Sequence, residues 1–317
     1  MSQPNASRRG SLQYWPRKRC THSSVRIRTW VPNNQAKILG FIGYKAGMTH
    51  ILANDNRPKS ETKGETVMIP ATIVDCPPMF VHGVSFYQHS HKITSIFAEK
   101  TVPELGMKLT LPKKPAKSMS NVKEFDDVRL LINSQPKYAS SIGTKMPKIL
   151  ELALNGSKTD KFNYAQSVLG KEISVKEALG ELHLVDIRGV TKGKGFQGTV
   201  KRYGVPIRQH KAEKTKRGIG NLGSWTPKRV QFTVAQPGKM GYHQRTEYNK
   251  EILKVGEQGS DLNPAGGIIN YGLVRGNYVL IKGSIPGPKK RAVVLTPAVR
   301  PNRKMTKGAY DIKVIAK

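Results

Sequence analysis

Residues 188–245 read RGVTKGKGFQGTVKRYGVPIRQHKAEKTKRGIGNLGSWTPKRVQFTVAQPGKMGYHQR, and the rest of the chain is interpreted outward from them. Between the two terminal arginines the basic residues are Lys192, Lys194, Lys201, Arg202, Arg208, Lys211, Lys214, Lys216, Arg217, Lys228, Arg229 and Lys239. Glu213 is the one acid. A segment so cationic and so rich in glycine cannot bury enough apolar surface to offset the entropy of ordering it. We therefore expect it to order against a polyanion and not by itself.

The whole chain shares this bias. Its 317 residues include 54 Lys and Arg against 21 Asp and Glu, a formal net charge of +33. Such self-repulsion is tolerated mainly when a partner neutralises it, and the commonest such partner is nucleic acid. A solvated basic surface and an anionic membrane are the alternatives, but the sequence has no apolar run of spanning length and no lipidation signal. Arginines near the start interrupt any secretory segment, so we expect a cytoplasmic protein.

No catalytic or metal-binding constellation can be assembled from the sequence. Cys20 and Cys76 form no CxxC pair and have no zinc-ligand spacing, which fits a reducing cytosol. His89 and His91 are spaced like metal ligands across a strand, but no cysteine or carboxylate completes a set. The acids cluster far in sequence from the histidines of the cationic stretch. We therefore expect no enzyme activity, no metal and no cofactor.

Residues 1–36 are predicted to form an extended basic arm. They contain no acid, and tryptophans and prolines interrupt both helical and strand periodicity. Arginine offers forked donors to phosphates, and tyrosine or tryptophan can stack on bases, so this composition suits RNA. A disordered, solvated tail is the alternative.

Strand patterns begin after the arm. Alternate residues of VMIPATIVD, 67–75, are apolar and predict one face of a sheet. Other short strands are predicted at 39–52, 81–88, 93–99, 181–187, 251–256, 269–274, 277–285 and 291–299. Short strands without long helices between them indicate a barrel or a sandwich. Strands on both sides of the cationic stretch should share one sheet system, which makes that stretch a long excursion from a folded core.

Acids return between residues 99 and 181, where an α+β insert is predicted. PKILELALNG, 147–156, has proline in a first-turn position and glycine as a stop, which predicts a helix. SVKEALG, 174–180, carries a capping box of Ser174 and Glu177 and predicts another helix. NVKEFDDVRLLI, 121–132, fits a third helix, although its VRLLI run could be a strand. The lower local charge indicates that this insert faces solvent or protein.

Gly193, Gly195 and Gly198 satisfy the bare spacing of a dinucleotide-binding loop. That loop requires a following helix and an acid for the ribose, whereas Gly204 and Pro206 should end any helix early. Alternatively, the glycines let the backbone approach a phosphate ribbon that neighbouring lysines neutralise. We favour the phosphate interpretation.

Trp225 is the informative aromatic residue of the cationic stretch. It lies in NLGSWTP, 221–227, a segment too polar to bury it in a core of its own. It is either a local hydrophobic anchor or a wedge and stacking surface inside folded RNA. We favour stacking.

An ordered set of residues runs through the chain: Leu179, Asp186, Gly189, Thr191, GKGFQG over 193–198, and Arg202. It resembles the signature of the L-three family, the third protein of the large ribosomal subunit. Further matches are RRGSLQYWPRKR, GFIGYKAGMTH, GNLGSWTP, GYHQRTEYNK, INYG and KGSIPGPKKR. The arm and the insert resemble archaeal and eukaryotic members more than bacterial ones, and the chain end resembles archaeal members. Ser224 and Lys216 depart from residues common among relatives, which leaves the fine shape of the loop tip open.

The resemblance implies a mainly β fold with an α+β insert, built on a six-stranded β-barrel of the translation-protein type. It implies an extended basic N-terminal arm and a long loop through ribosomal RNA toward the peptidyl transferase centre, with Trp225 at the tip. It also implies RNA binding early in assembly, neighbours of the L-fourteen and L-twenty-four-e types, and no homo-oligomer.

We therefore predict a non-enzymatic structural constituent of the large ribosomal subunit. The alternatives are an RNA-modifying or nucleotide-dependent enzyme using Gly193–Gly198, and a chromatin-like DNA-packaging protein. The predicted domains are the arm 1–36, a first barrel part 37–98, the insert 99–181, a barrel strand 182–188, the basic loop 189–246, and a second barrel part with a C-terminal tail 247–317. The predicted RNA-binding residues are Arg8, Arg9, Arg17, Lys18, Arg19, Lys192, Gly193, Lys194, Gly195, Gly198, Lys201, Arg202, Arg208, Lys211, Lys216, Arg217, Lys228, Arg229, His243 and Arg245.

Overall fold

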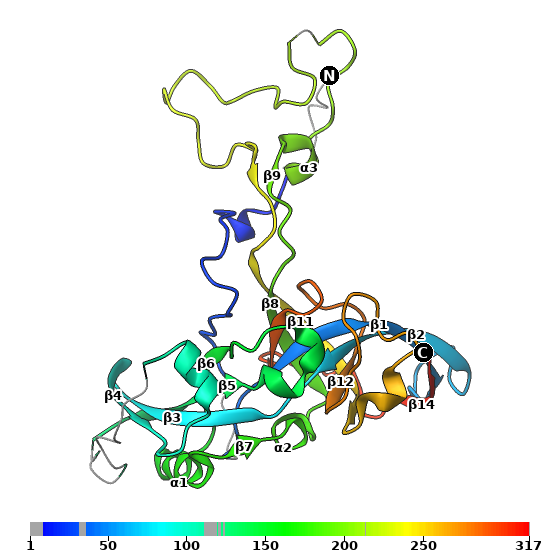
Figure 1. The fold of residues 1–317 in the computed structure, drawn as a ribbon. Helices are drawn as coiled ribbons and strands as arrows, with labels where there is room; N and C mark the ends of the chain where they lie inside the picture. The colour runs from blue at the N-terminus through cyan, green and yellow to red at the C-terminus, as the bar shows by residue number, and fades with distance from the viewer. Residues whose placement is uncertain are drawn as a thin grey trace. The chain divides into compact units, whose positions relative to one another are not determined.

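The computed structural model describes residues 9–31, 36–110, 119, 122, 124–212 and 214–316 and is mainly β (Figure 1). The prediction of a mainly β chain is confirmed. Two compact units divide the chain: Met1–His22 with Val190–Gln244, and Ser23–Gly189 with Arg245–Lys317. We call them the arm–loop unit and the sheet unit. No described helix is long and apolar enough to cross a membrane.

A seven-stranded sheet carries the loop between two of its strands. In chain order its strands are β1 (Phe41–Asp55), β2 (Thr66–Asp75), β8 (Leu184–Val190), β11 (Gln244–Gly256), β12 (Tyr278–Lys282), β13 (Ala292–Pro297) and β14 (Tyr310–Ile315). The spatial order is β13-β8-β11-β12-β2-β1-β14, and β13 also pairs with β1. Because β8 and β11 are neighbours, the strands before and after the cationic stretch belong to one sheet, as predicted.

A second, five-stranded sheet forms the insert. It consists of β3 (Met79–Gln88), β4 (His91–Phe97), β5 (Asp127–Ser134), β6 (Ile149–Ala153) and the short β7 (Glu172–Ile173). The order is β4-β3-β5-β6, and β7 pairs with β3. The two sheets therefore divide between β2 and β3, whereas the insert was predicted over 99–181. The reason is that β3 takes β5 as its partner, from Met79 opposite Ser134 onward.

The helix predicted over 147–156 is wrong, because its central residues, Ile149–Ala153, form β6. Leu152 and Ala153 at the end of this strand are both buried. β6 pairs with β5, with Leu152 opposite Leu130. Gly156, at φ +101°, precedes the N-cap Ser157 of a helix that was not predicted, α1 (Lys158–Val168). Pairing with a neighbouring strand therefore outweighs the local helix signals.

The segments 121–132 and 174–180 were also predicted to be helical. The third helix proposed for 121–132 is wrong where described, since β5 begins at Asp127, and the strand alternative is confirmed. The helix over 174–180 is confirmed as α2 (Val175–Leu179), where the Ser174 hydroxyl accepts the N–H of Glu177 at 3.3 Å.

The strand predicted at 269–274 is also wrong. Asn270 and Gly272 have φ of +57° and +111°, so the chain turns there. Short 3₁₀ turns complete the described elements: Leu12–Tyr14, Pro103–Met107, Pro136–Tyr138, Ser140–Ile142 and Gly259–Leu262.

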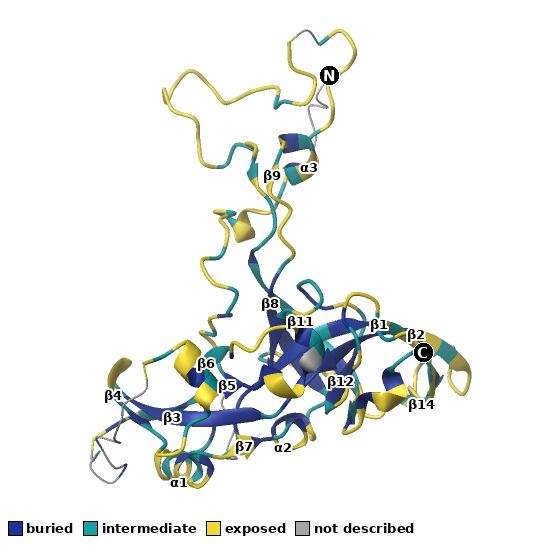
Figure 2. Cartoon of the chain, viewed as in Figure 1, coloured by how far each residue is buried: buried dark blue, intermediate teal, exposed yellow. Residues whose placement is uncertain are grey.

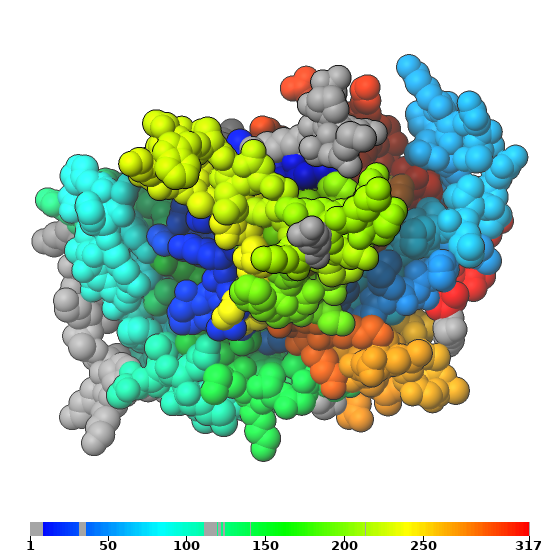
Figure 3. Space-filling view, turned by 90° about the horizontal axis from the view of Figure 1, so that it is seen from above, coloured from blue at the N-terminus to red at the C-terminus, as the bar shows by residue number. Residues whose placement is uncertain are grey.

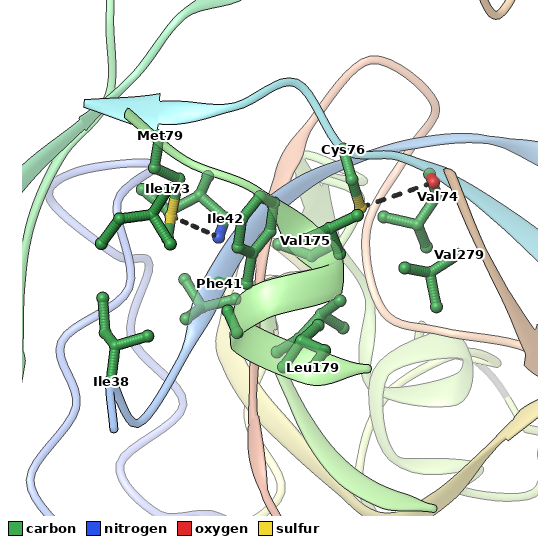
Figure 4. Packing of buried hydrophobic residues seen from close by; sticks show 14 of the residues in the cluster. Ile38, Phe41, Ile42, Val74, Cys76, Met79, Ile173, Val175, Leu179 and Val279 are labelled. Atoms are coloured by element: carbon green, nitrogen blue, oxygen red, sulfur yellow. Dashed lines mark hydrogen bonds between the residues drawn. The ribbon is translucent and has the colours of Figure 1, made fainter. Parts of the chain in front are cut away.

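Figure 4 shows a part of the core of the sheet unit, around α2 and the neighbouring strands β1 and β2. Phe41 and Leu179 are fully buried there, and the Ile42 N–H contacts the Met79 sulfur at 3.2 Å. Cys76 is part of this core, and burial raises the pKa of its thiol well above the ordinary value. Leu179 of the family signature is therefore a packing residue.

The arm–loop unit has little regular structure. It contains β9 (Phe196–Gln197), β10 (Gly238–Lys239) and the five-residue helix α3 (Thr199–Tyr203). Its described residues from Gly204 to Pro237 form no helix or strand, and most of them are exposed (Figure 2). This agrees with a segment that lacks a core of its own.

Candidate nucleic-acid interface

A buried carboxylate organises the sheet from which the loop departs. Asp186 on β8 accepts the N–H of Asn249 and the N–H of Val299, both at 2.9 Å. Its side chain is fully buried, and the backbone donors it accepts come from β11 and from the segment after β13. Asp186 therefore ties together three segments that are distant in sequence.

Arg188, two residues further along β8, binds the inner part of the arm. Its guanidinium donates to the Thr29 carbonyl and to the Thr296 hydroxyl, each at 3.3 Å. Burial lowers the pKa of Arg188, and the nearby Asp186 opposes that shift. A Cβ at Gly189 would meet Pro286 at 3.2 Å, so only glycine fits this close approach without movement.

The two ends of the loop pair to form a stem within the arm–loop unit. The N–H of Lys194 bonds to the Met240 carbonyl and that of Met240 to the Gly195 carbonyl, each at 2.9 Å. The N–H of Thr191 bonds to the His243 carbonyl at 2.9 Å. A short antiparallel ladder therefore fixes the loop at its base.

The outer part of the arm lies along this stem. The N–H of Cys20 bonds to the Tyr242 carbonyl, and a ring nitrogen of His243 lies 2.8 Å from the Lys18 carbonyl. Arg19 lies over the Tyr242 ring, 5.9 Å from its centroid. His243 is buried and is used in holding the arm, a role that the sequence did not suggest.

An aromatic cluster joins arm and loop further out. The Trp15 ring lies 5.5 Å from the Tyr203 ring and 6.1 Å from the Phe232 ring. Arg17 lies over the Tyr203 ring at 4.3 Å from its centroid. We call Trp15, Arg17, Arg202, Tyr203 and Phe232 the arm–loop junction. It is the nearest equivalent of a core in this unit, since Tyr203 is buried there.

The arginines of the junction use backbone carbonyls as their hydrogen-bond acceptors. Arg17 donates to the Arg202 carbonyl at 3.0 Å, and Arg202 donates to the carbonyls of Arg17 at 3.3 Å and Gln236 at 2.8 Å. Apart from Glu213, which lies outside the described residues, neither 9–22 nor 190–244 contains an acid. The positive charges of this unit therefore have no carboxylate among its described residues to neutralise them.

Most of the predicted RNA-binding residues lie on the surface of this unit. The exposed ones are Arg9, Lys18, Arg19, Lys192, Gly193, Lys194, Gly195, Gly198, Lys201, Arg208, Lys211, Lys216, Arg217, Lys228 and Arg229. Arg17 and Arg202 are half-buried in the junction, and Arg245 is half-buried in β11 of the sheet unit. Arg8 lies outside the described residues. In Figure 3 the side chains of the loop are drawn yellow-green to yellow.

The glycine motif does not form a dinucleotide site in its described surroundings. Gly198 is the N-cap of α3, but this helix ends after five residues at Gly204, whose φ is +68°. Gly195 also needs its positive φ, +69°. A Cβ at Gly195 or Gly198 would meet nothing within 4 Å, so the backbone here is open to a ligand.

Trp225 is 85% exposed. A shallow hollow beside it is lined by Leu222, Gly223, Ser224, Pro227, Lys228, Arg229 and Val230. The apolar surface of Trp225 and the adjacent cations lie together, a combination that suits stacking on bases next to phosphates.

His89 and Ser90 form the turn between β3 and β4, with φ of +47° and +66°. Across the described residues no three His, Cys, Asp or Glu side chains are grouped as metal ligands.

Comparison with known proteins identifies the class of the chain. The model of the family described as "Ribosomal protein L3" matches residues 1–314. The chain is 41% identical to the large ribosomal subunit protein uL3 of Methanopyrus kandleri, over 99% of this chain and 91% of that protein. The corresponding values are 41%, 96% and 94% for Methanocaldococcus jannaschii, and 43%, 93% and 92% for Archaeoglobus fulgidus.

These matches place the chain among the proteins of the large ribosomal subunit, a non-enzymatic class of cytoplasmic ribonucleoprotein components. The chain belongs to the ribosomal protein L3 family. The resemblance found from the sequence is therefore confirmed, and the enzyme alternative is excluded.

Proposed function

We propose that the arm 1–36 and the basic loop 189–246 bind large-subunit ribosomal RNA. The observation that carries the proposal is the arm–loop unit itself, which exposes nearly all its cations and has no described acid to pair with them. Phosphates would supply the missing counter-charge. Specificity would come from RNA shape and from stacking on exposed aromatic rings more than from base-edge hydrogen bonds.

The finer parts of the proposal follow the family resemblance. The loop would reach toward the peptidyl transferase centre with Trp225 at its tip, and the protein would join the subunit early in assembly. Its protein neighbours would be of the L-fourteen and L-twenty-four-e types. The exposure of Trp225 supports its assignment as a tip residue.

We also propose that six strands of the seven-stranded sheet close into a barrel. The strand order β13-β8-β11-β12-β2-β1 together with the pairing of β13 with β1 supports closure. In the β1–β13 pair Phe41 lies opposite Leu295. A closed sheet would give the loop a rigid base, since closure removes free edges.

Salt dependence tests the RNA interface. The affinity of the full chain for a large-subunit RNA transcript should fall steeply as salt rises, by somewhat less than one unit of log–log slope per neutralised phosphate. Charge-neutral substitution of Lys192 and Lys194 should reduce that slope by one to two units. An affinity that hardly changes with salt would contradict the proposal. Footprinting of the same transcript would identify the protected nucleotides.

A further inference from the structure

The outer edge of β14, in the sheet unit, has no strand paired with it among the described residues. Among the described strands β14 pairs with β1 alone and ends the strand order. The N–H of Ala316 bonds to the His50 carbonyl, and that of Asn56 to the Ala309 carbonyl, each at 2.9 Å. In an antiparallel ladder the groups alternate, so the adjacent Tyr310 and Ile315 direct their N–H and C=O away from β1.

A groove of about 580 Å³ follows this edge. It is lined by all of β14, by Leu253 and Lys254 of β11, and by Asp261. The pairing of β14 with β1 shifts register at Lys313, between Val314 and Ile312, so the groove offers two short stretches of strand edge, one around Tyr310 and one around Ile315. An edge of this kind is completed by another extended chain.

An exposed apolar row crosses the sheet face next to the groove. Leu52 on β1 lies opposite Met68 on β2 and opposite Val314 on β14. These three side chains are 40%, 66% and 54% exposed. Residues directly opposite one another share a face, so the three form one strip. A contiguous apolar strip of this kind is typical of a protein contact.

The charges that line the groove favour a protein over RNA as its binding partner. Lys254 and Lys313 are balanced there by Asp261 and Asp311. This balance is unusual in a chain of net charge +33, and an RNA backbone requires an excess of cations. The backbone edge, the apolar strip and the neutral groove all fit an extended polypeptide.

We propose that an extended segment of another large-subunit protein adds to the outer edge of β14 as a further strand. Alternate apolar side chains of that segment cover the strip of Met68, Leu52 and Val314. The proposal rests on the chain's place in the large subunit and not on RNA binding by the arm and loop.

Site-specific cross-linking identifies the occupant. The full chain carries the photoreactive residue benzoylphenylalanine at position 314 and is assembled into large subunits, which are purified in high salt and irradiated. The expected product joins Val314's position to one short segment of a single other protein. The same probe at Ile93, which is 49% exposed on β4, should not give that product. A cross-link from position 314 to RNA or to a second copy of the chain would overturn the proposal.

Amide hydrogen exchange tests strand addition directly. The Ile315 amide should exchange at least about tenfold more slowly in subunits than in the free chain. The Ala316 amide is bonded to His50 in both states and is the internal reference. Val314→Asp should abolish the added protection without altering thermal unfolding, and Ile93→Asp should leave the protection intact. RNA footprints without protection of Ile315 would refute this inference alone, whereas protection of Ile315 without footprints would refute the proposed function alone.

Discussion

Arg17 and Arg202 each donate a guanidinium hydrogen bond to the other's backbone carbonyl, at 3.0 and 3.3 Å. The reciprocal pair holds two like charges together at the arm–loop junction. Arg17 also covers the Tyr203 ring, so hydrogen bonds and cation–π contact offset the repulsion. Neutralisation by a polyanion would stabilise this arrangement further.

The reciprocal pair predicts that Arg17→Lys weakens the junction although the charge is kept. Lysine lacks the planar fork that reaches the Arg202 carbonyl while covering the Tyr203 ring. Limited proteolysis of the free chain should cleave near residues 203–208 several-fold faster in this variant. Lys201→Arg, on the exposed face of α3, is the control and should cleave at the wild-type rate. Equal cleavage rates for wild type and both variants would contradict a stabilising role of the junction.

Trp225→Ala should leave the free energy of unfolding within about 0.5 kcal/mol of wild type, because the side chain is almost fully exposed. Incorporation into large subunits should be largely intact. The effect should appear in tRNA binding or in drug response near the catalytic RNA. Wild-type behaviour in peptide-bond formation, factor-dependent steps and drug footprints would reduce Trp225 to a local anchor.

Asp186→Ala should destabilise the sheet unit by about 2–4 kcal/mol, because it leaves the N–H groups of Asn249 and Val299 without their acceptor. Denaturant unfolding of the full chain measures the loss. Asp186→Asn retains one acceptor oxygen and should lose less. Asp311→Asn, at an exposed position of β14, should have almost no effect. A similar loss in Asp186→Ala and Asp311→Asn would contradict this role of Asp186.

Asp75 should make stability fall as pH rises from about 4 to about 6. Burial raises the pKa of Asp75 from 3.8 to about 6, and a hydrogen bond from the Tyr271 hydroxyl partly opposes this shift. The folded state then binds the proton of Asp75 more tightly than the unfolded state does. The stabilisation that results is lost as the pH rises above the pKa of Asp75 in the folded state. The full effect is about 3 kcal/mol. In Asp75→Asn the difference between variant and wild type should change over this pH window and become constant outside it.

Titration of His82 should change the stability with pH in the opposite direction to titration of Asp75. Burial lowers the pKa of His82 from 6.5 to about 4, and the ring stacks on Phe97 with 6.1 Å between centroids. The unfolded state binds the proton more tightly, so stability should fall as pH falls from about 6.5 to about 4. His82→Leu should remove this slope in urea titrations at fixed ionic strength. The windows of His82 and Asp75 overlap, so each variant must be compared with wild type at every pH.

The sequence predicts the strands well where apolar residues alternate, as in β2, or form a short continuous apolar run, as in β12 and β13. It fails at β6, where Pro147 and Gly156 imitate helix boundaries and only pairing with β5 reveals a strand. The cationic character of the arm–loop unit is visible from composition alone. The junction could not be predicted, because Trp15 and Phe232 lie far apart in the sequence and their contact appears only in the folded structure.

The residues of the arm–loop junction lie far apart in the sequence, so they are synthesised at different times. The contact between Arg17 and Arg202 spans 185 positions, and Phe232 emerges later still. A growing chain therefore presents its basic N-terminus well before the residues that will hold it exist. During that interval the cations of the arm can bind any polyanion that the nascent chain meets.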